Sequence, residues 1–209
     1  KPIKLFIIIQ FNIYNLNNNQ QMEKLKDSVD ATIASADVER GVSILLTGNG
    51  KGKSSSAFGM VKRALGYDFR VAVVQFIKCE QLSGEELYVR DKCSEVTFYQ
   101  MDTGFTWDTQ DRSGDIEAAV RTWEVAAQML SDPSYHLVVL DELTHMPSFK
   151  YLDQIMVMAA LNDRPDNQSV VVTGGGGSAL IEWADTVSEL KEVKHAYNAG
   201  IMARRGVDF

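Results

Sequence analysis

Cysteine, histidine and proline are all scarce in this chain. Its 209 residues include 2 cysteines, 3 histidines and 4 prolines. Cys79 and Cys93 lack the spacing of a zinc site, and His136, His145 and His195 share no spacing typical of metal ligands. The composition therefore excludes a disulfide scaffold and a zinc module, and it predicts reduced thiols in a cytoplasmic protein and structural or surface histidines.

The chain also lacks an excess of basic residues. It carries 21 Lys and Arg against 28 Asp and Glu, a formal net charge of −7. Broad binding to nucleic acid or to an anionic membrane requires a basic face, so we expect neither as a partner. With 45% hydrophobic residues, the length fits one globular domain that buries a sizeable core.

The N-terminal residues differ from the rest. An apolar run from residue 3 to 14, interrupted by Gln10 and Asn12, precedes a polar tract at residues 15–21. The run is too short and too interrupted to span a bilayer, and no small-residue cleavage site follows it. We interpret residues 1–21 as a disordered or upstream extension, with a targeting segment as the alternative. Spaced apolar residues then predict a short amphipathic N-terminal helix within residues 22–40, ahead of a main domain at 41–209.

Apolar runs alternate with helical patterns through the main domain. Strands are expected at residues 42–46, 71–77, 96–99, 137–140 and 170–172, and helices from the glycine-rich turn through 65, at 115–130 and at 152–161. This alternation predicts an α/β fold, a mostly parallel sheet with helices on both faces. Ligands of such sheets bind at the carboxyl ends of the strands, so residues 48–54, 141–142 and 174–177 should converge on one crevice.

The glycine-rich turn after the first strand has the pattern of a phosphate-binding P-loop. Its glycines allow backbone amides to face phosphate oxygens, Lys53 adds a positive charge, and the Ser54 hydroxyl can ligate Mg²⁺. A turn that binds nothing would not require lysine and serine directly after a buried strand. The predicted nucleotide-binding residues are Thr47, Gly48, Asn49, Gly50, Lys51, Gly52, Lys53, Ser54 and Ser55.

Two carboxylates follow the fourth predicted strand. Asp141 and Glu142 come directly after four apolar residues, where a P-loop protein places a carboxylate that holds Mg²⁺ directly or through water. Acidic residues also end strands without any catalytic role, but the P-loop in the same chain favours a metal-binding role for this pair. The sequence does not decide which of the two touches it.

From about residue 29 to 209 the chain resembles the P-loop family of ATP:corrinoid adenosyltransferases of the bacterial cobalamin pathway. The residues that carry the resemblance are TGNGKGK at 47–53, VQFIK at 74–78, TGFTWDT at 103–109, LDEL at 140–143, ADTVSEL at 184–190, HAYNAG at 195–200 and GVDF at 206–209. The resemblance implies a P-loop NTPase (RecA-like) fold. It also implies transfer of the 5′-deoxyadenosyl group of ATP to the Co(I) of cobalamin or a related corrinoid, with release of triphosphate.

The family implies roles for several residues and partners. Lys53, the loop amides and Mg²⁺ (or Mn²⁺) would stabilise the leaving triphosphate, and reduced cobalt would be the nucleophile. Phe105 and Trp107 would occupy the lower face of the corrin, which eases reduction to Co(I); without the resemblance they are a hydrophobic anchor for their loop. An electron donor such as a reduced flavoprotein and a homodimer are expected partners, with the N-terminal helix as a lid.

The sequence departs from the family at Gly175. An arginine is usual at this place, and its loss would remove a charge-assisted phosphate contact worth about 1.5 to 3 kcal/mol. Lys51, Lys78 and Arg204 are candidates to compensate. Two alternative functions stay open. One is a P-loop ATPase or phosphotransferase, in which Glu142 orients the acceptor; the other, which the missing arginine favours, is a weakly active paralogue that binds nucleotide or corrinoid.

Overall fold

The computed structural model describes residues 19–77, 83–102 and 112–209. The chain splits into two compact units, residues 1–39 and residues 40–209. The described helix of the first unit, α2, covers Asn19–Ser35, close to the predicted position but starting earlier and ending earlier than expected. Among the described residues, no helix is long and apolar enough to cross a lipid bilayer.

The second unit is built on one parallel sheet of six strands. Its strands are β1 (Ser43–Thr47), β2 (Val71–Gln75), β3 (Val96–Gln100), β4 (Leu137–Asp141), β5 (Ser169–Thr173) and β6 (Thr186–Glu189), in the order β3-β2-β4-β5-β1-β6. Every pairing is parallel; Gln75, for example, lies opposite both Gln100 and Asp141. The predicted α/β fold with a mostly parallel sheet is confirmed.

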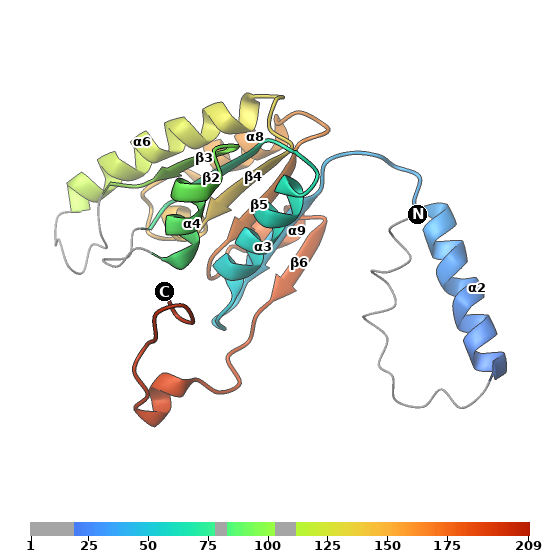
Figure 1. Ribbon diagram of the computed structural model, residues 1–209. Helices are drawn as coiled ribbons and strands as arrows, with labels where there is room; N and C mark the ends of the chain where they lie inside the picture. The colour runs from blue at the N-terminus through green and yellow to red at the C-terminus, as the bar shows by residue number, and fades with distance from the viewer. Residues whose placement is uncertain (1–18, 78–82, 103–111) are drawn as a thin grey trace. The chain divides into compact units, whose positions relative to one another are not determined.

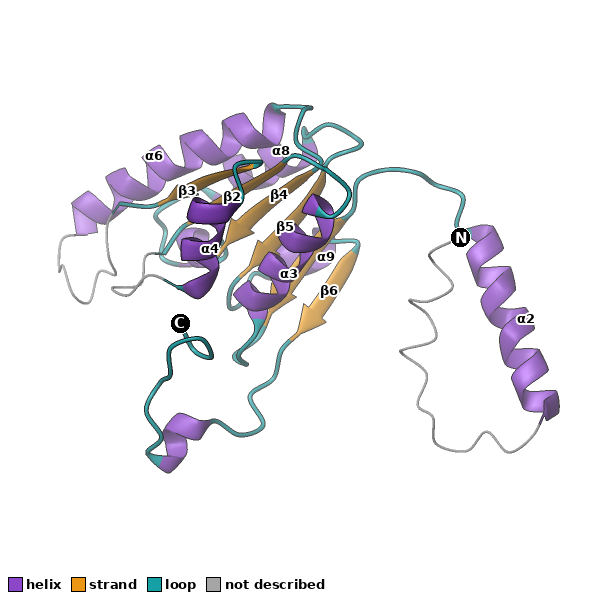
Figure 2. Cartoon of the chain, viewed as in Figure 1, coloured by secondary structure: helices purple, strands orange, loops and turns teal. Residues whose placement is uncertain are grey.

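Helices cover both faces of this sheet (Figure 1). One face carries α3 (Lys53–Leu65) and α4 (Gly84–Lys92); the other carries α6 (Arg112–Ser131), α8 (Gln154–Asn162) and α9 (Ser178–Trp183) (Figure 2). Alternate residues of β2 face the two layers: Val71 and Val73 pack with α3 and α4, and Ala72 and Val74 pack with α6. Both sides of the strand are buried, which explains its continuous apolar run.

The sequence pattern did not reveal several elements. Edge strand β6 has no apolar run, because all four of its residues are exposed. Helix α4 is largely polar; its start is fixed by Ser83, whose side chain accepts a hydrogen bond from the Glu86 amide. The short helices α7 (His145–Ser148) and α9 and the 3₁₀ turn η1 (Ala196–Ala199) were also not predicted.

Candidate active site

The turn between β1 and α3 is shaped by a segment from the far end of the chain. A Cβ atom on Gly48 would lie 2.3 Å from the Leu190 carbonyl oxygen, and one on Gly50 would lie 2.8 Å from backbone atoms of Leu190 and Lys191. These two positions therefore exclude any side chain. Gly52 has φ 113°, in the left-handed region that favours glycine, and α3 begins at the next residue.

Backbone hydrogen bonds tie the turn to residues 190–192. The Leu190 amide donates to the Thr47 carbonyl at 2.8 Å, and the Gly50 amide donates to the Leu190 carbonyl at 2.7 Å. The Glu192 amide donates to Asn49 Oδ1 at 3.1 Å. The Gly50 amide is thus engaged by a carbonyl of the chain itself.

Both lysines of the turn have partners in the chain. Lys53 Nζ donates to the carbonyls of Gly48 at 3.0 Å and Gly50 at 3.3 Å. Lys51 Nζ forms an ion pair with Asp208 Oδ1 at 2.9 Å. The two ammonium groups are held close to the turn, where an anion can meet them.

Asp141, at the end of β4, is a buried carboxylate held by hydrogen bonds. Its Oδ1 accepts from Thr173 Oγ1 at 2.6 Å, and its Oδ2 accepts from Gln75 Nε2 at 2.9 Å. Burial raises the pKa of Asp141, while hydrogen bonds from Thr173, Gln75 and Ser54 act in the opposite direction. Desolvation outweighs these bonds, so its ionised form is costly.

Glu142 differs from its neighbour in backbone and in exposure. It has φ 59°, an unusual conformation for a residue with a side chain, and its amide donates to Thr173 Oγ1 at 2.9 Å. Its carboxylate is about one quarter exposed, and Oε2 lies 2.9 Å from His145 Nε2. The strained turn after β4 thus brings one carboxylate out of the core, next to an imidazole.

The glycines after β5 lie beside this turn. The Thr144 hydroxyl donates to the Gly175 carbonyl at 3.0 Å, and the Thr47 hydroxyl donates to the Gly176 carbonyl at 3.4 Å. A Cβ on Gly174 would lie 3.4 Å from Glu142 Oε2. The three segments predicted to converge at the carboxyl ends of the strands therefore do so.

A pocket of about 390 Å³ opens between the P-loop and the end of β4. Two lysines, one histidine and four carboxylates contribute to its described wall. The lining residues are Gly50, Lys51, Gly52, Lys53, Ser54, Ser55, Phe58, Gln75, Ile77, Ser83, Glu85, Asp141, Glu142, His145 and Asp208. Most of the predicted nucleotide and metal residues are thereby brought together.

Comparison with known proteins shows the family of this chain. The family model of ATP:corrinoid adenosyltransferases BtuR/CobO/CobP matches residues 39–209. The chain belongs to this family. It is 52% identical to a corrinoid adenosyltransferase of Pseudomonas aeruginosa, over 92% of this chain and 95% of that protein. It is 47% identical to the corrinoid adenosyltransferase CobA of Salmonella typhimurium, over 91% of this chain and 96% of that protein.

The predicted activity is confirmed by these relationships. The protein is an ATP:corrinoid adenosyltransferase, whose substrates are ATP and a corrinoid. Three predicted nucleotide-binding residues, Thr47, Gly48 and Asn49, are not among the residues that line the pocket. Phe105, Trp107 and Lys78 lie outside the described residues of this adenosyltransferase.

Sequence reasoning gave no role to several residues of the pocket. Gln75 and Asp208 belong to segments that carry the family resemblance, but nothing local indicates what they contact. Glu85 and Ser83 come from the unexpected helix α4 and its cap. His145, a structural or surface histidine by prediction, has its imidazole against Glu142, and a Cβ on Gly175 would lie 3.7 Å from it.

Proposed function

We propose that the adenosyltransferase holds the triphosphate of ATP in the pocket between the P-loop and β4. The observation that carries this is the pair of ammonium groups, Lys51 and Lys53, fixed at the turn that opens α3. As the 5′ carbon of ATP moves to Co(I), its bond to the triphosphate oxygen breaks and negative charge grows on the leaving group. Fixed positive groups stabilise that charge without reorganisation.

The charge balance of the pocket supports a divalent cation. Its described wall carries two lysines against Glu85, Asp141, Glu142 and Asp208. A triphosphate is strongly anionic, so these carboxylates would repel it unless a cation intervenes. Among the described residues, no three His, Cys, Asp or Glu side chains form a metal-binding group. Mg²⁺ is commonly held by one or two protein oxygens together with substrate phosphates, a mode that this pocket fits.

We assign the metal contacts to Ser54 and Glu142. Both oxygens of Asp141 already accept hydrogen bonds from Thr173 and Gln75, whereas the Glu142 carboxylate reaches the pocket. Asp141 then orients the Ser54 hydroxyl, which is one of its hydrogen-bond partners. The cation, Mg²⁺ or Mn²⁺, would add positive charge beside the leaving triphosphate.

Lys53 is assigned to the leaving group. Its ammonium has three donors, and two of them are used by the Gly48 and Gly50 carbonyls. The third donor supports a contact to phosphate without loss of the bonds that fix the side chain. For Phe105 and Trp107 we retain the role implied by the family, exclusion of a ligand from the lower face of the corrin.

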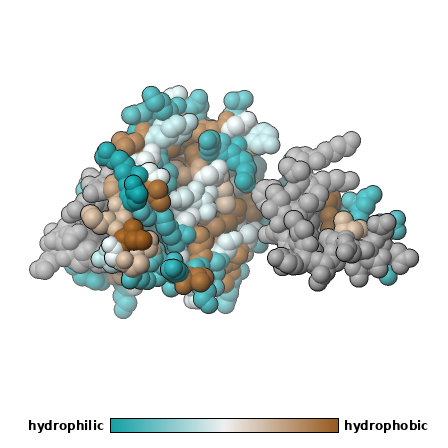
Figure 3. All heavy atoms as spheres, turned by 60° about the horizontal axis from the view of Figure 1, so that its bottom comes forward, coloured by the Kyte–Doolittle hydropathy of each residue, from teal (hydrophilic) through white to brown (hydrophobic). Residues whose placement is uncertain are grey.

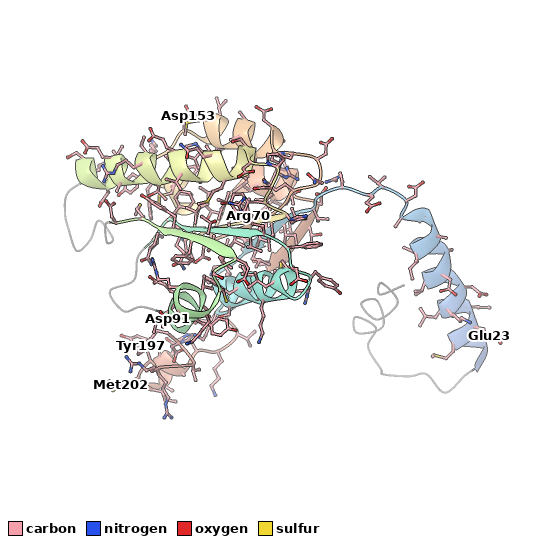
Figure 4. All side chains as sticks on the ribbon, turned by 45° about the horizontal axis from the view of Figure 1, so that its top comes forward. Glu23, Arg70, Asp91, Asp153, Tyr197 and Met202 are labelled. Carbon is pink, nitrogen blue, oxygen red and sulfur yellow. The ribbon has the colours of Figure 1, made fainter. Side chains whose placement is uncertain are left out.

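Three further proposals concern the enzyme's oligomeric state, its electron donor and its location in the cell. We propose a homodimer, supported by exposed apolar side chains on the C-terminal segment: Val193, Tyr197, Ile201, Met202 and Val207. Tyr197 and Met202 project away from the sheet (Figure 4), and hydrophobic atoms lie among hydrophilic ones on the face shown in Figure 3. We further propose an electron donor such as a reduced flavoprotein and a cytoplasmic location, in keeping with the buried free thiol of Cys93.

One reaction tests the assignment of the pocket. The protein is incubated with ATP, Mg²⁺ and chemically reduced cobalamin, and the phosphate product is identified together with the cobalt–carbon chromophore. Triphosphate is expected, and Lys53→Met should reduce its formation by at least tenfold while the protein stays folded. ADP as the product, or an unaffected Lys53→Met variant, would contradict the proposed site. Light scattering at several protein concentrations tests the dimer.

A further inference from the structure

The C-terminal residues 206–209 lie beside the P-loop, although about 150 residues separate them in the sequence. Asp208 Oδ1 is 2.9 Å from Lys51 Nζ, and Asp208 is among the residues that line the phosphate pocket. Figure 1 shows the chain returning toward α3 and α4 at its C-terminus. The end of the chain is thus positioned to act on the nucleotide site.

The Asp208 carboxylate is also held by a residue of the C-terminal segment itself. Its Oδ2 accepts a hydrogen bond from the Arg204 amide at 2.8 Å, and its amide donates to the Arg204 carbonyl at 2.8 Å. The Gly206 amide donates to the Phe209 carbonyl at 2.7 Å, with Gly206 at φ 78°. These bonds form a closed turn, so the carboxylate is presented by a defined backbone. The Lys51 ammonium and the Arg204 amide hold the pKa of Asp208 below its usual range.

The same turn and two helices also line a second space. A second cavity, of about 440 Å³, lies between α3, α4 and the C-terminal turn, and Val207 and Phe209 form part of its wall. Phe58 and Asp208 border both this cavity and the phosphate pocket. The C-terminal turn is therefore a shared wall of the two spaces.

We propose that Asp208 is a positioning residue for the adenosyl transfer, which holds the Lys51 ammonium at the phosphate pocket so that Lys51 meets the triphosphate. The inference rests on the proposed role of this pocket. An ammonium group has three donors, and the bond to Asp208 leaves two for phosphate oxygens. A lysine side chain loses much rotational entropy when it is fixed. Because the ion pair already restricts Lys51 in the free protein, less entropy is lost when ATP binds.

The opposite effect of Asp208 would be competition with the triphosphate for Lys51. Competition would require the ammonium to leave the carboxylate when ATP binds. The geometry favours positioning, because the Arg204 amide holds the Asp208 carboxylate, a second bond to Arg204 holds the Asp208 backbone, and the donor count of Lys51 allows both contacts at once. The two mechanisms predict opposite changes in affinity, so they can be separated.

The test is a double-mutant cycle on binding alone. Wild type, Asp208→Asn, Lys51→Met and the double variant are titrated with ATP and with triphosphate by calorimetry, in Mg²⁺ and without corrinoid. Asp208→Asn keeps the size of the side chain and removes its charge. We expect it to weaken both ligands about two- to fivefold, the range of exposed ion pairs. In the Lys51→Met background it should have no further effect, and Asp208→Glu should restore part of the affinity.

Several results would overturn the proposal. Tighter binding by Asp208→Asn would indicate competition, and an equal loss in both backgrounds would indicate a purely structural role. Unchanged affinity in Asp208→Asn, together with a clear loss in Lys51→Met, would refute the positioning role of Asp208 but leave the assignment of the phosphate pocket intact. If Lys51→Met and Lys53→Met both bound ATP like wild type, the pocket assignment itself would fail. Melting temperatures measured alongside separate these losses from unfolding.

Discussion

Replacement of Gly175 by arginine should strengthen the adenosyltransferase's hold on the triphosphate. Gly175 follows the end of β5, at the place where the family resemblance implies an arginine. A Cβ there would meet only His145 Cε1, at 3.7 Å, an ordinary contact. Its backbone is also outside the left-handed region, unlike Gly174 at φ 135°, Gly176 at φ 80° and Gly177 at φ 96°. Of these four glycines, Gly175 alone accepts a side chain without strain.

The expected gain follows from the energy of a charge-assisted hydrogen bond. Such a bond contributes about 1.5 to 3 kcal/mol, which corresponds to about 10- to 150-fold in affinity. A guanidinium also reduces the excess of carboxylates in the pocket wall. We therefore expect Gly175→Arg to lower the KM for ATP and the Kd for triphosphate. Release of triphosphate can then become slower, so kcat need not rise in proportion.

The assay compares three variants in one set of titrations. Gly175→Ala should melt and bind ATP like wild type, which shows that the position tolerates a side chain. Gly174→Ala should lose stability, because its Cβ would lie 2.1 Å from Thr144 Oγ1 and the strained backbone costs a further amount of about 1 to 3 kcal/mol. Gly175→Arg that folds like wild type but binds ATP no tighter would refute the reasoning. A higher Mg²⁺ requirement would show the guanidinium pairing with Glu142 instead.

Three further substitutions test the fold and the site. Asp185→Asn should lower the free energy of unfolding at pH 7 by about 1 to 2 kcal/mol after allowance for solvent screening, because Asp185 pairs with Arg40. The pKa of Asp185 is lowered in the folded state, so the carboxylate stabilises the fold fully above its ordinary pKa of about 3.9, and this stabilisation is lost progressively as the pH falls toward the lowered pKa. Urea titrations should therefore show a smaller deficit of the variant at pH 2.5 than at pH 7, and an equal deficit would contradict this. Gln75→Leu removes a hydrogen-bond donor to Asp141 Oδ2, which should cost about 1 to 3 kcal/mol in stability and raise the Mg²⁺ needed for half-maximal activity; an unchanged Mg²⁺ titration would argue against it. Trp107→Ala should impair turnover from Co(II) much more than turnover from preformed Co(I), and equal losses would indicate an anchoring role.

Local sequence patterns predict the part of the fold that is buried on both faces. The strands around Val73, Val139 and Val171 are runs of apolar residues, and each was expected within two residues of its observed bounds. Strand β6 has no such run, since an exposed edge places no hydrophobic requirement on its side chains. Helix α4 has a polar sequence with two buried residues, one of them Glu86, so periodicity does not reveal it.

The candidate site was predictable where parallel topology alone decides it. The P-loop, the acidic pair after β4 and the glycines after β5 meet because parallel strands end at one edge of the sheet. The contacts made by residues 190–192 and by Asp208 depend on how the chain returns to the P-loop. The bond from the Glu192 amide to Asn49 spans 143 positions, and no local pattern specifies it.

A chain of polar side chains beside the pocket explains how the buried carboxylate of Asp141 is kept in place. Gln75 donates to Asp141 and accepts from Gln100 Nε2 at 3.2 Å, and the same Gln100 nitrogen lies 3.1 Å from Glu86 Oε2. Glu86 in turn accepts from Arg90 at 2.8 Å. Because the oxygen of the Gln75 amide is engaged on one side, its NH₂ group must face Asp141, which fixes the donor that the buried carboxylate needs. Helix α4, the polar helix that periodicity does not predict, therefore contributes to the order of the proposed metal site through Gln100 of β3 and Gln75 of β2.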